Sequence, residues 1–556
     1  MSNLKSLLKS LYKVLNKPYS IFFIFTFLLN LISNSAYLFT AELEVVNAAI
    51  ITLCLSALIA YIEAVIFKVV EKIKLFRVSY VCIVVFIHNL FIIFDYFCLV
   101  NFQTTINQDK IDIIAETDSA EIVSFLITYV SIYTVLLILL CLFAFNYLLF
   151  RISTLLYYRK QCLNALLGLA LLGAVIYGIT AFNYVVYHNG RNVPQYTAPT
   201  RVAYSVYLMK QREAEIENLS VLCKRVKAEA TKEKTNIIVL IGESYSLYHS
   251  SLYGYKLETT PNMTVRYKNG ELLFLRNAIT ISDFTHGAME SVFSLDSLRT
   301  QFTSKPLFPS CFKNAGYFTS MYDNQYFVKP QMNFLSNASV SEAMFNKRNT
   351  KRYKYDGDMI KDIQVENKPT LYVIHLQGQH YTYNARYPKS FEYFTPSQYD
   401  SKRFTDEQRL HLSEYDNVTR YNDYVVNELI KKFENTNTIL IYFSDHGEEL
   451  YEQSDYNGHG NSPFVKDLSY QIRVPFIVWM SKCYKAANME LFKKVKKCEA
   501  YPIITDDISH LLLDISGVRT KDFNPTRSFV NDKYNINKPR IVLNSINFDE
   551  VIKNNR

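Results

Sequence analysis

The chain has 556 residues, a formal charge of +9 and a hydrophobic content of 49%, with only 15 Gly and 15 Pro. This composition excludes a disordered or fibrous protein, because such chains are poor in apolar residues or rich in Gly and Pro. The length favours three or four domains at roughly 150 residues each. The mean hydropathy of zero is usual for a soluble protein, but here it averages two unlike halves.

Five long apolar runs fill the chain as far as residue 186. Each is close to the ~20 residues needed to cross a bilayer, and few charges interrupt them. We therefore interpret them as membrane spans and not as buried helices of a soluble core. We expect no cleaved signal peptide, because no small-residue cleavage site follows the first run. The predicted spans are Tyr19–Thr40, Val46–Phe67, Val78–Val100, Val123–Phe150 and Leu163–Val185.

Positive charges lie in alternate segments between these spans, and the other two loops carry few of them. By the positive-inside rule, the N-terminus is cytoplasmic and everything after residue 186 is external. Topology thus explains much of the +9 charge, and no nucleic-acid-binding motif accompanies it. The charged residues are Lys5, Lys9, Lys13 and Lys17, then Lys68, Lys72, Lys74 and Arg77, then Arg151, Arg159 and Lys160.

Three ionisable residues, Glu63, His88 and Asp95, lie inside the predicted spans. They allow two interpretations: a polar pathway or substrate groove, or pairing between helices or snorkelling toward an interface. We favour the second interpretation. No regular series of charges runs through several spans, which argues against a transporter.

Four of the nine cysteines lie in the external part of the chain. An oxidising compartment permits disulfides there. Cys483 and Cys498 bracket one short segment and form our predicted pair, with Cys223 and Cys311 as a second candidate pair. No CxxC spacing indicates a thiolate zinc site.

The composition changes after the last span. Residues 187–234 are polar and charged, which predicts a bridging helix between the membrane and a soluble domain. From residue 235, short β-branched runs alternate with amphipathic stretches, which indicates an α/β domain with a largely parallel sheet. The predicted organisation is a membrane domain over 1–186, a linker over 187–234 and a catalytic domain over 235–556.

Polar side chains follow three of the predicted strands at the point where each strand ends. The strands end in Glu243, in His380, and in Asp445 with His446, while a Gly-flanked loop supplies His459. Ligands bind at the carboxyl ends of strands in open α/β sheets, so these side chains can meet at one edge. Carboxylate and imidazole donors suit Zn²⁺, with Mn²⁺ as the alternative.

A hydroxyl nucleophile is expected in the segment 276–298. Its candidates are Thr280, Ser282, Thr285 and Ser291. A hydroxyl at a helix N-terminus lies where backbone N–H groups favour a phosphate, although each hydroxyl can also be a helix cap. We choose Thr285, where a strand-like run gives way to a helix, and place Ser282 second.

The motifs IGES, LYGY, TTPN, GQHYTYNARYP, YDNVTRYNDYVV, SDHGEEL and RVPFIVWMS occur in this order. In this respect the chain resembles the lipid phosphoethanolamine transferases. These are inner-membrane enzymes that modify lipid A, including those behind polymyxin resistance, and they belong to the alkaline phosphatase and sulfatase superfamily. The resemblance implies a five-span membrane helix bundle followed by an α/β, alkaline phosphatase/sulfatase-like domain with a mostly parallel central sheet.

The resemblance also implies roles for individual residues. His380 and His459 match the histidines that hold a second metal or the donor phosphate, and as catalytic residues they would stabilise the phosphoryl oxygens or protonate the leaving group. The external loop resembles the family's substrate-binding loop, which assigns Thr117 and Glu121 to the lipid head group. The residues that match the family's zinc ligands are Glu243, Thr285, Asp445 and His446.

The implied reaction moves phosphoethanolamine from phosphatidylethanolamine to lipid A or another surface glycan. Thr285 would attack the phosphorus, release diacylglycerol and carry the group until the acceptor displaces it. We expect a monomer in the bacterial inner membrane with its catalytic domain in the periplasm.

Other functions are compatible with parts of this pattern. A phosphoglycerol transferase of the lipoteichoic acid synthase type has the same five spans and metal–threonine chemistry. A membrane sulfatase needs a C/S-x-P-x-R motif, which this chain lacks. A non-enzymatic membrane scaffold predicts that the ligand residues are lost, yet every expected position is filled.

Overall fold

The chain divides into two compact units, Met1–Gln211 and Arg212–Arg556. A helix, α9 (Ala198–Arg225), runs across the division. The structure is a computed structural model. It describes residues 17–39, 45–70, 74–102, 105–107, 111, 132–187, 197–296, 302–325, 334–349, 351–453, 455, 457–460, 468–543 and 545–554.

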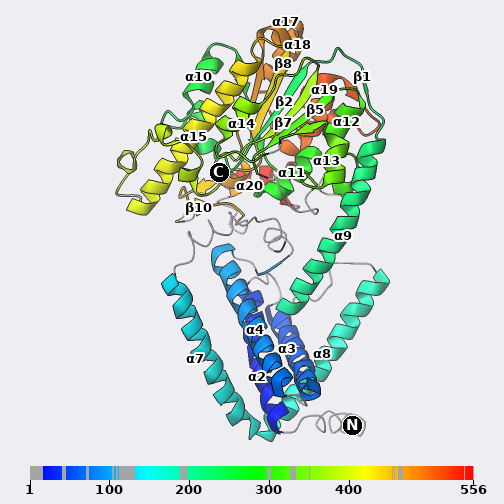
Figure 1. The fold of residues 1–556 in the computed structure, drawn as a ribbon, viewed down its shortest axis with the longest axis vertical. Helices are drawn as coiled ribbons and strands as arrows, with labels where there is room; N and C mark the ends of the chain where they lie inside the picture. Colours follow the sequence, from blue (N-terminus) through cyan, green and yellow to red (C-terminus); the bar gives the residue numbers. More distant parts are fainter. Residues whose placement is uncertain are drawn as a thin grey trace. The chain divides into compact units, whose positions relative to one another are not determined.

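Among its described residues, the first unit contains five helices that are long and apolar enough to cross a membrane, as predicted (Figure 1). The beginning of the predicted fourth span, at Val123, lies outside the described residues. The fourth helix continues past the predicted end at Phe150 as far as Tyr157, and Arg151 in this extension donates to the Tyr147 hydroxyl one turn earlier. The five helices are α2 (Lys17–Ser35), α3 (Val45–Val70), α4 (Lys74–Phe102), α7 (Ile132–Tyr157) and α8 (Lys160–Tyr187).

The ionisable residues of the spans have partners on other segments. Nε2 of His88 lies 2.8 Å from a Glu63 carboxylate oxygen, and Asn30 donates to the other oxygen of that carboxylate at 3.1 Å. Asp95 pairs with Arg201 in the first turns of α9. These contacts agree with pairing between helices, which is the less costly way to bury such groups in a membrane.

The predicted disulfides are not present, because all nine cysteines are free. The prediction of a Cys483–Cys498 bridge is wrong, because the two thiols have different surroundings. Cys483 is exposed in α17 (Lys482–Ala487), whereas Cys498 is buried at the end of α18 (Met489–Lys497). The Cys483 thiol contacts the Thr436 carbonyl at 3.1 Å, and the Cys498 thiol contacts the Phe529 carbonyl at 3.2 Å.

The second unit is built on a seven-stranded sheet of order β3–β11–β8–β2–β7–β5–β6. Strands β8, β2, β7, β5 and β6 are parallel, and β11 is antiparallel to both of its neighbours. The predicted mostly parallel sheet is therefore confirmed. The strands are β2 (Asn236–Gly242), β3 (Leu272–Phe274), β5 (Phe318–Asp323), β6 (Lys347–Arg348), β7 (Thr370–His375), β8 (Thr438–Ser444) and β11 (Phe476–Met480).

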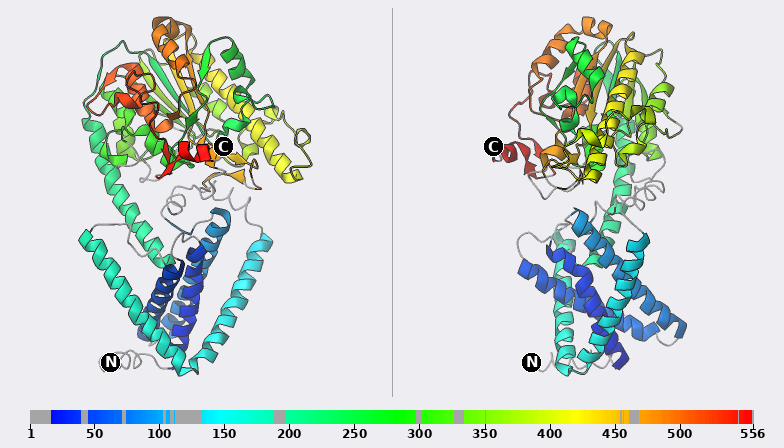
Figure 2. Two further views of the ribbon diagram at one scale, coloured as in Figure 1. Left: turned by 180° about the vertical axis from the view of Figure 1, so that it is seen from behind. Right: turned by 90° about the vertical axis from the view of Figure 1, so that its left-hand side faces the viewer.

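Helices cover both faces of this sheet (Figures 1 and 2). Alternate residues of β2 enter two different cores: Ile237 and Val239 pack on one face, Ile238 and Leu240 on the other. Burying one such side chain stabilises the fold by about 1.5–3 kcal/mol. The helices are α11 (Thr285–Phe293), α12 (Phe308–Asn314), α13 (Ala338–Met344) and α19 (Ile508–Ser516) on the first face, and α10 (Pro261–Lys268), α14 (Asp356–Asp362) and α15 (Asp406–Phe433) on the second.

Short strand pairs complete the second unit. One of them, β9 with β10, brings two loop segments together after β8. The pairs are β1 (Glu229–Ala230) with β13 (Val518–Arg519), β4 (Ala278–Ile279) with β12 (Ile503–Ile504), β9 (Glu449–Leu450) with β10 (Asn457–Gly458), and β14 (Ile541–Val542) with β15 (Ile546–Asn547). Helices α16 (Leu468–Ile472) and α20 (Phe548–Asn554) lie late in the chain.

A buried histidine of α19 is held in its neutral form. Nε2 of His510 lies 3.1 Å from the Leu295 carbonyl, and Nδ1 accepts from the Asn524 backbone N–H at 3.1 Å. Burial and the nearby Arg527 guanidinium lower the pKa of His510 to about 3. A second proton on the ring would set Nδ1–H against the N–H of Asn524.

We expect the free energy of unfolding to fall as the pH drops from 6.5 towards 3, because the unfolded chain then binds a proton that folded His510 does not. The slope from this residue approaches about 1.4 kcal/mol per pH unit. His510→Gln should be less stable than wild type near pH 7 and should lose less on acidification. Urea unfolding of both proteins at several pH values measures the difference. Parallel pH curves would contradict the prediction.

Candidate active site

The ends of two neighbouring strands bring three predicted ligands together. Strands β2 and β8 are paired in register through Gly242 and Ser444, so the residues that follow them are adjacent. These residues are Glu243 after β2 and Asp445 with His446 after β8. One donor atom from each lies within 4.8 Å of the other two, and all three side chains are buried.

Thr285 joins this group from the opposite direction. It is the first residue of α11, and its hydroxyl lies 3.2 Å from Oε2 of Glu243 and 3.4 Å from Nε2 of His446. A phosphate at this hydroxyl would face the N-terminus of α11, where unpaired backbone N–H groups favour an anion. The arrangement suits a hydroxyl nucleophile beside a cation.

The other hydroxyl candidates are used locally. Ser282 accepts from the Phe284 N–H at 3.3 Å and donates to the Phe284 carbonyl at 3.1 Å. Ser291 donates to the Ala288 carbonyl within α11 at 2.8 Å. Thr280 is buried. Among these four hydroxyls, within the described part of the chain, only that of Thr285 lies within hydrogen-bond distance of the candidate ligands.

A second cluster shares His446 with the first. The pairing of β9 with β10 places His459 beside Glu448, and Nδ1 of His459 lies 2.6 Å from Oε2 of Glu448. The ring centroids of His446 and His459 are 4.1 Å apart. Tyr383 donates to the other Glu448 oxygen at 2.9 Å and so holds this carboxylate in place. Donor atoms of His446, Glu448 and His459 also lie within 4.8 Å of one another.

His380 lies near both clusters, in the loop after β7. Burial lowers its pKa to about 3 despite the opposing charge of Glu243, and His446 and His459 are among the groups that influence it. Its Nδ1 is buried and has no hydrogen-bond partner among the described residues. The ring is therefore neutral at pH 7 and has a lone pair available for a metal or a hydroxyl donor.

The loop that carries His380 packs directly on Glu243. Gly378 has a φ of +48°, and a Cβ there would lie 2.8 Å from the Glu243 backbone nitrogen. The buried Asp356 carboxylate accepts the N–H groups of Gln377 and Gly378, both at 2.9 Å. This close approach needs glycine and fixes the distance between the loop and Glu243.

The charges of the first cluster favour a cation. Burial and the neighbouring Glu243 carboxylate raise the pKa of Asp445 to about 7. Burial lowers the pKa of His446, but Asp445 and Glu243 outweigh it and raise that pKa to about 10. Oδ2 of Asp445 accepts no hydrogen bond from the described residues, although it lies 3.4 Å from Nε2 of His446. Two buried carboxylates, one of them with an oxygen that accepts no hydrogen bond, and an imidazole fit a divalent metal such as zinc.

The site also contains residues that were not predicted from the sequence, among them Gln325 and Glu448. Gln325, two residues after β5, donates from Nε2 to Oε2 of Glu243 at 2.7 Å and to the Leu376 carbonyl at 2.9 Å. Glu448 lies two residues after His446, so its position in the DHGEE run was the sequence feature that could have predicted it. Thr117 and Glu121, the predicted head-group residues, lie outside the described residues.

A helix residue reaches the turn beside Thr285. Arg212 of α9 contacts Nε2 of His286 at 2.5 Å and pairs with Glu290 in the next turn of α11. Nε2 of His286 also lies 3.1 Å from the Glu290 carboxylate. These contacts tie the middle of α9 to the N-terminal turn of α11, on which Thr285 lies.

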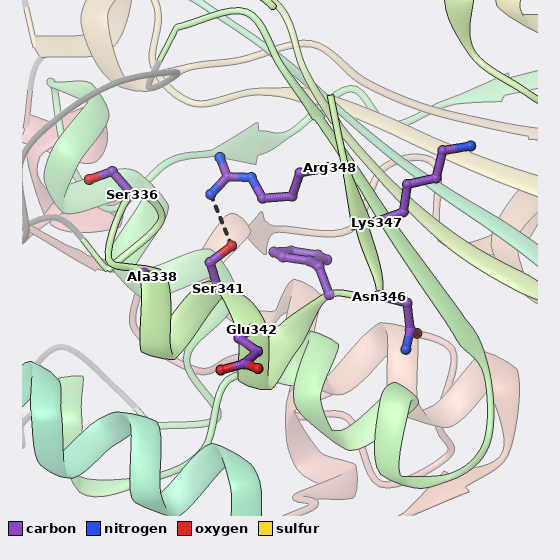
Figure 3. A pocket seen from close by; sticks show the side chains of 8 residues that line it. Ser336, Ala338, Ser341, Glu342, Asn346, Lys347 and Arg348 are labelled. Carbon is purple, nitrogen blue, oxygen red and sulfur yellow. Dashed lines mark hydrogen bonds between the residues drawn. The ribbon is translucent and has the colours of Figure 1, made fainter. Parts of the chain in front are cut away.

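A shallow surface pocket of about 280 Å³ lies elsewhere, beside α13 and β6 (Figure 3). Arg348 crosses it and donates to the Ser341 hydroxyl at 3.0 Å, and Lys347 pairs with Glu366 at 3.0 Å. None of the candidate ligands lines it. Its polar side chains form hydrogen bonds and ion pairs with nearby residues. The pocket is not part of the candidate site.

The second unit matches a known protein family. The sulfatase family profile covers residues 235–518, which is more than half of the chain. The chain belongs to the sulfatase family.

Relatives of this sulfatase-family chain include transferases. It is 29% identical over 322 residues to the phosphoethanolamine transferase EptC of Escherichia coli K12, a match that covers 55% of each protein. It is 27% identical over 257 residues to the phosphoethanolamine transferase EptA of Helicobacter pylori, covering 45% of this chain and 48% of that protein. The chain spans about half the length of the curated relatives it matches.

Two solved structures resemble the sulfatase-family chain. The periplasmic domain of E. coli EptC in complex with zinc matches with a TM-score of 0.52 and 26% identity, covering 58% of this chain and 96% of that one. The integral membrane protein EptA of Neisseria meningitidis matches with a TM-score of 0.58 over 91% of this chain and 97% of that one. At 15% identity, the second likeness shows the fold: apolar N-terminal helices followed by a sulfatase-like domain.

Proposed function

We propose that this protein transfers phosphoethanolamine from phosphatidylethanolamine to lipid A or another surface glycan. The observation that carries the proposal is the position of the Thr285 hydroxyl, within 3.4 Å of both Glu243 and His446 at the start of α11. The names of its relatives support phosphoethanolamine as the transferred group.

The reaction has two displacements at phosphorus. In the first, the Thr285 oxygen forms a bond to phosphorus, the bond to the diacylglycerol oxygen breaks, and diacylglycerol leaves with a proton. In the second, an acceptor oxygen attacks, the bond from phosphorus to Thr285 breaks, and the threonine regains a proton. The phosphoethanolamine–threonine ester between the two steps divides one difficult displacement into two easier ones.

The residues suited to hold zinc are Glu243, Asp445, His446 and Thr285. Mn²⁺ is the alternative metal for such oxygen and nitrogen donors. A bound divalent metal would lower the pKa of a hydroxyl and neutralise charge on the phosphate oxygens. Glu243 accepts the hydrogen bond of the Thr285 hydroxyl and so holds this oxygen beside the other candidate ligands.

Three further residues lie near the candidate zinc ligands: His380, Glu448 and His459. Because the pKa of His380 is about 3, this side chain is a neutral partner and does not protonate the leaving group at pH 7. It suits contact with a donor phosphate or a second metal. His459 is held by Glu448, which fixes the orientation of its ring.

The membrane helices suit lipid substrates. We place the protein in the bacterial inner membrane as a monomer, with a cytoplasmic N-terminus and a periplasmic catalytic unit. Donor and acceptor would both be lipids, so a membrane-anchored site meets them at one surface. Thr117 and Glu121 remain our predicted contacts to the lipid head group.

The full chain, purified in detergent, tests this function. It is given lipid A with either labelled phosphatidylethanolamine or labelled phosphatidylglycerol, and the lipids are analysed by mass spectrometry. A phosphoethanolamine mass gain on lipid A, removed by EDTA and restored by Zn²⁺, is the expected result. Transfer from phosphatidylglycerol alone would favour a phosphoglycerol transferase. No transfer from either lipid, with or without added metal, would favour a scaffold.

A further inference from the structure

Ser244 has an unusual backbone for a serine. It directly follows Glu243, is completely buried, and has a φ of +51°. This left-handed conformation suits glycine, because a side chain at such a position crowds the neighbouring carbonyl. Backbone strain of this kind persists where the surrounding structure holds it, and it gathers at functional sites.

The side chain and the backbone of Ser244 contact different carboxylates. Its hydroxyl donates to Oε1 of Glu243 at 2.7 Å, and its N–H donates to Oδ1 of Asp445 at 3.1 Å. One residue therefore holds both acidic members of the candidate metal cluster. The left-handed turn is what aims these two donors at two carboxylates from adjacent strands.

Ser244 contacts only one of the two oxygens of each carboxylate. Oδ1 of Asp445 accepts from Ser244 and from the His446 N–H at 2.7 Å, whereas Oδ2 accepts nothing from the described residues. Oε1 of Glu243 accepts from Ser244 and lies 3.3 Å from Nε2 of His446, while Oε2 accepts from the Thr285 hydroxyl at 3.2 Å and from Gln325 at 2.7 Å. Each carboxylate thus has one oxygen held by Ser244 and one directed at the site.

The turn itself is anchored from two sides. The Ser244 carbonyl accepts from the Tyr415 hydroxyl of α15 at 2.6 Å, and that hydroxyl accepts from the Ser246 N–H at 2.7 Å. The Tyr245 N–H lies 3.0 Å from the Ser444 hydroxyl and 3.1 Å from the His446 carbonyl. Glycine would form this turn with less strain, so the hydroxyl is the feature that a serine adds.

We propose that Ser244 is a positioning residue of the metal site, whose hydroxyl and left-handed backbone orient Glu243 and Asp445 for a divalent cation. The inference rests on the proposed metal-dependent function, and it concerns how this chain prepares its own ligands. Partners that orient metal ligands commonly contribute 10- to about 100-fold in metal affinity.

The test compares three variants of the full chain in detergent: Ser244→Ala, Ser244→Gly and Ser246→Ala. Ser246 is the matched control, because it is equally buried in the same turn and its hydroxyl has no hydrogen-bond partner among the described residues. Zn²⁺ affinity is measured by competition with a chromophoric chelator, and the visible spectrum of the Co²⁺-loaded proteins reports ligand geometry.

We expect both Ser244 variants to raise the Kd for Zn²⁺ by 10- to about 100-fold and to shift the Co²⁺ bands. Ser246→Ala should match wild type in both measurements. Ser244→Gly relieves the strained backbone, so its loss of affinity would not be a folding defect. Equal affinities and spectra for Ser244→Gly, Ser246→Ala and a wild type that binds Zn²⁺ tightly would overturn this inference alone. A wild type that binds no Zn²⁺ would overturn the proposed function and this inference with it.

Discussion

Thr285→Ala should abolish transfer while leaving the fold intact. The Thr285 hydroxyl lies at the start of α11 and contacts Glu243 and His446, and its removal takes away the oxygen that we propose attacks the phosphate. We expect the transfer rate to fall by about 10⁴-fold or more, the scale found when an enzyme nucleophile is removed. Wild-type protein incubated with phosphatidylethanolamine and no acceptor should gain one phosphoethanolamine mass, which the variant should lack.

Two further variants make this prediction specific. Ser282→Ala removes the second-choice hydroxyl, which is engaged with the backbone of Phe284, and should keep the adduct. Thr285→Ser retains a hydroxyl and should keep both the adduct and measurable transfer. An adduct that survives in Thr285→Ala, or disappears in Ser282→Ala, would move the nucleophile to another residue.

Asp445→Asn should have opposite effects on stability with and without zinc. With zinc present, the variant loses a charged ligand, and its affinity should fall by more than the roughly 100-fold typical of outer contacts. Binding at 100 times the Kd adds about 2.7 kcal/mol of stability, most of which the variant would lose. With a chelator present, it should be at least as stable as wild type, because two buried carboxylates no longer repel each other.

Thermal unfolding with Zn²⁺ and with EDTA measures both effects. Asp423→Asn is the control, because Asp423 is also a buried carboxylate but accepts from Asn262 and Met263 at the start of α10. This variant should lose the same stability in both conditions. A zinc-dependent rise in Tm that is equal in Asp445→Asn and wild type would show that Asp445 does not hold the metal.

The architecture was predictable from local pattern alone. The length of an apolar run decides whether a helix can cross a membrane, and five such helices are present where five spans were predicted. In the second unit, alternation of β-branched runs with helical segments predicted the mostly parallel sheet. Both signals reside in contiguous residues, so no knowledge of distant contacts was needed.

Part of the site was also predictable, through one general rule. Glu243 and Asp445 are about 200 positions apart, but both follow buried strands, and parallel strands place their carboxyl ends at one edge. The rule does not say which strands are neighbours. The order β8–β2–β7 supplies that fact, and it brings Glu243 between Asp445 and the loop of His380.

The cysteine prediction failed because it, too, depended on tertiary packing that the sequence order does not show. Cys483 and Cys498 are close in sequence, but α17 exposes the first while the second is buried against Phe529. Nearness along the chain does not set the direction of a thiol, and a disulfide requires close Cβ atoms. Burial of each side chain is a property of the packed unit.

Local patterns in the sequence predict the membrane-helix half, the α/β half and the strand ends that carry acids and imidazoles. The packed fold supplies contacts that these patterns do not predict: Thr285 faces Glu243, Glu448 holds His459, and Ser244 donates to two carboxylates. Periodicity and strand ends depend on neighbouring residues, so they can be recognised in the sequence. Which oxygen a donor contacts depends on backbone turns and on partners hundreds of residues away.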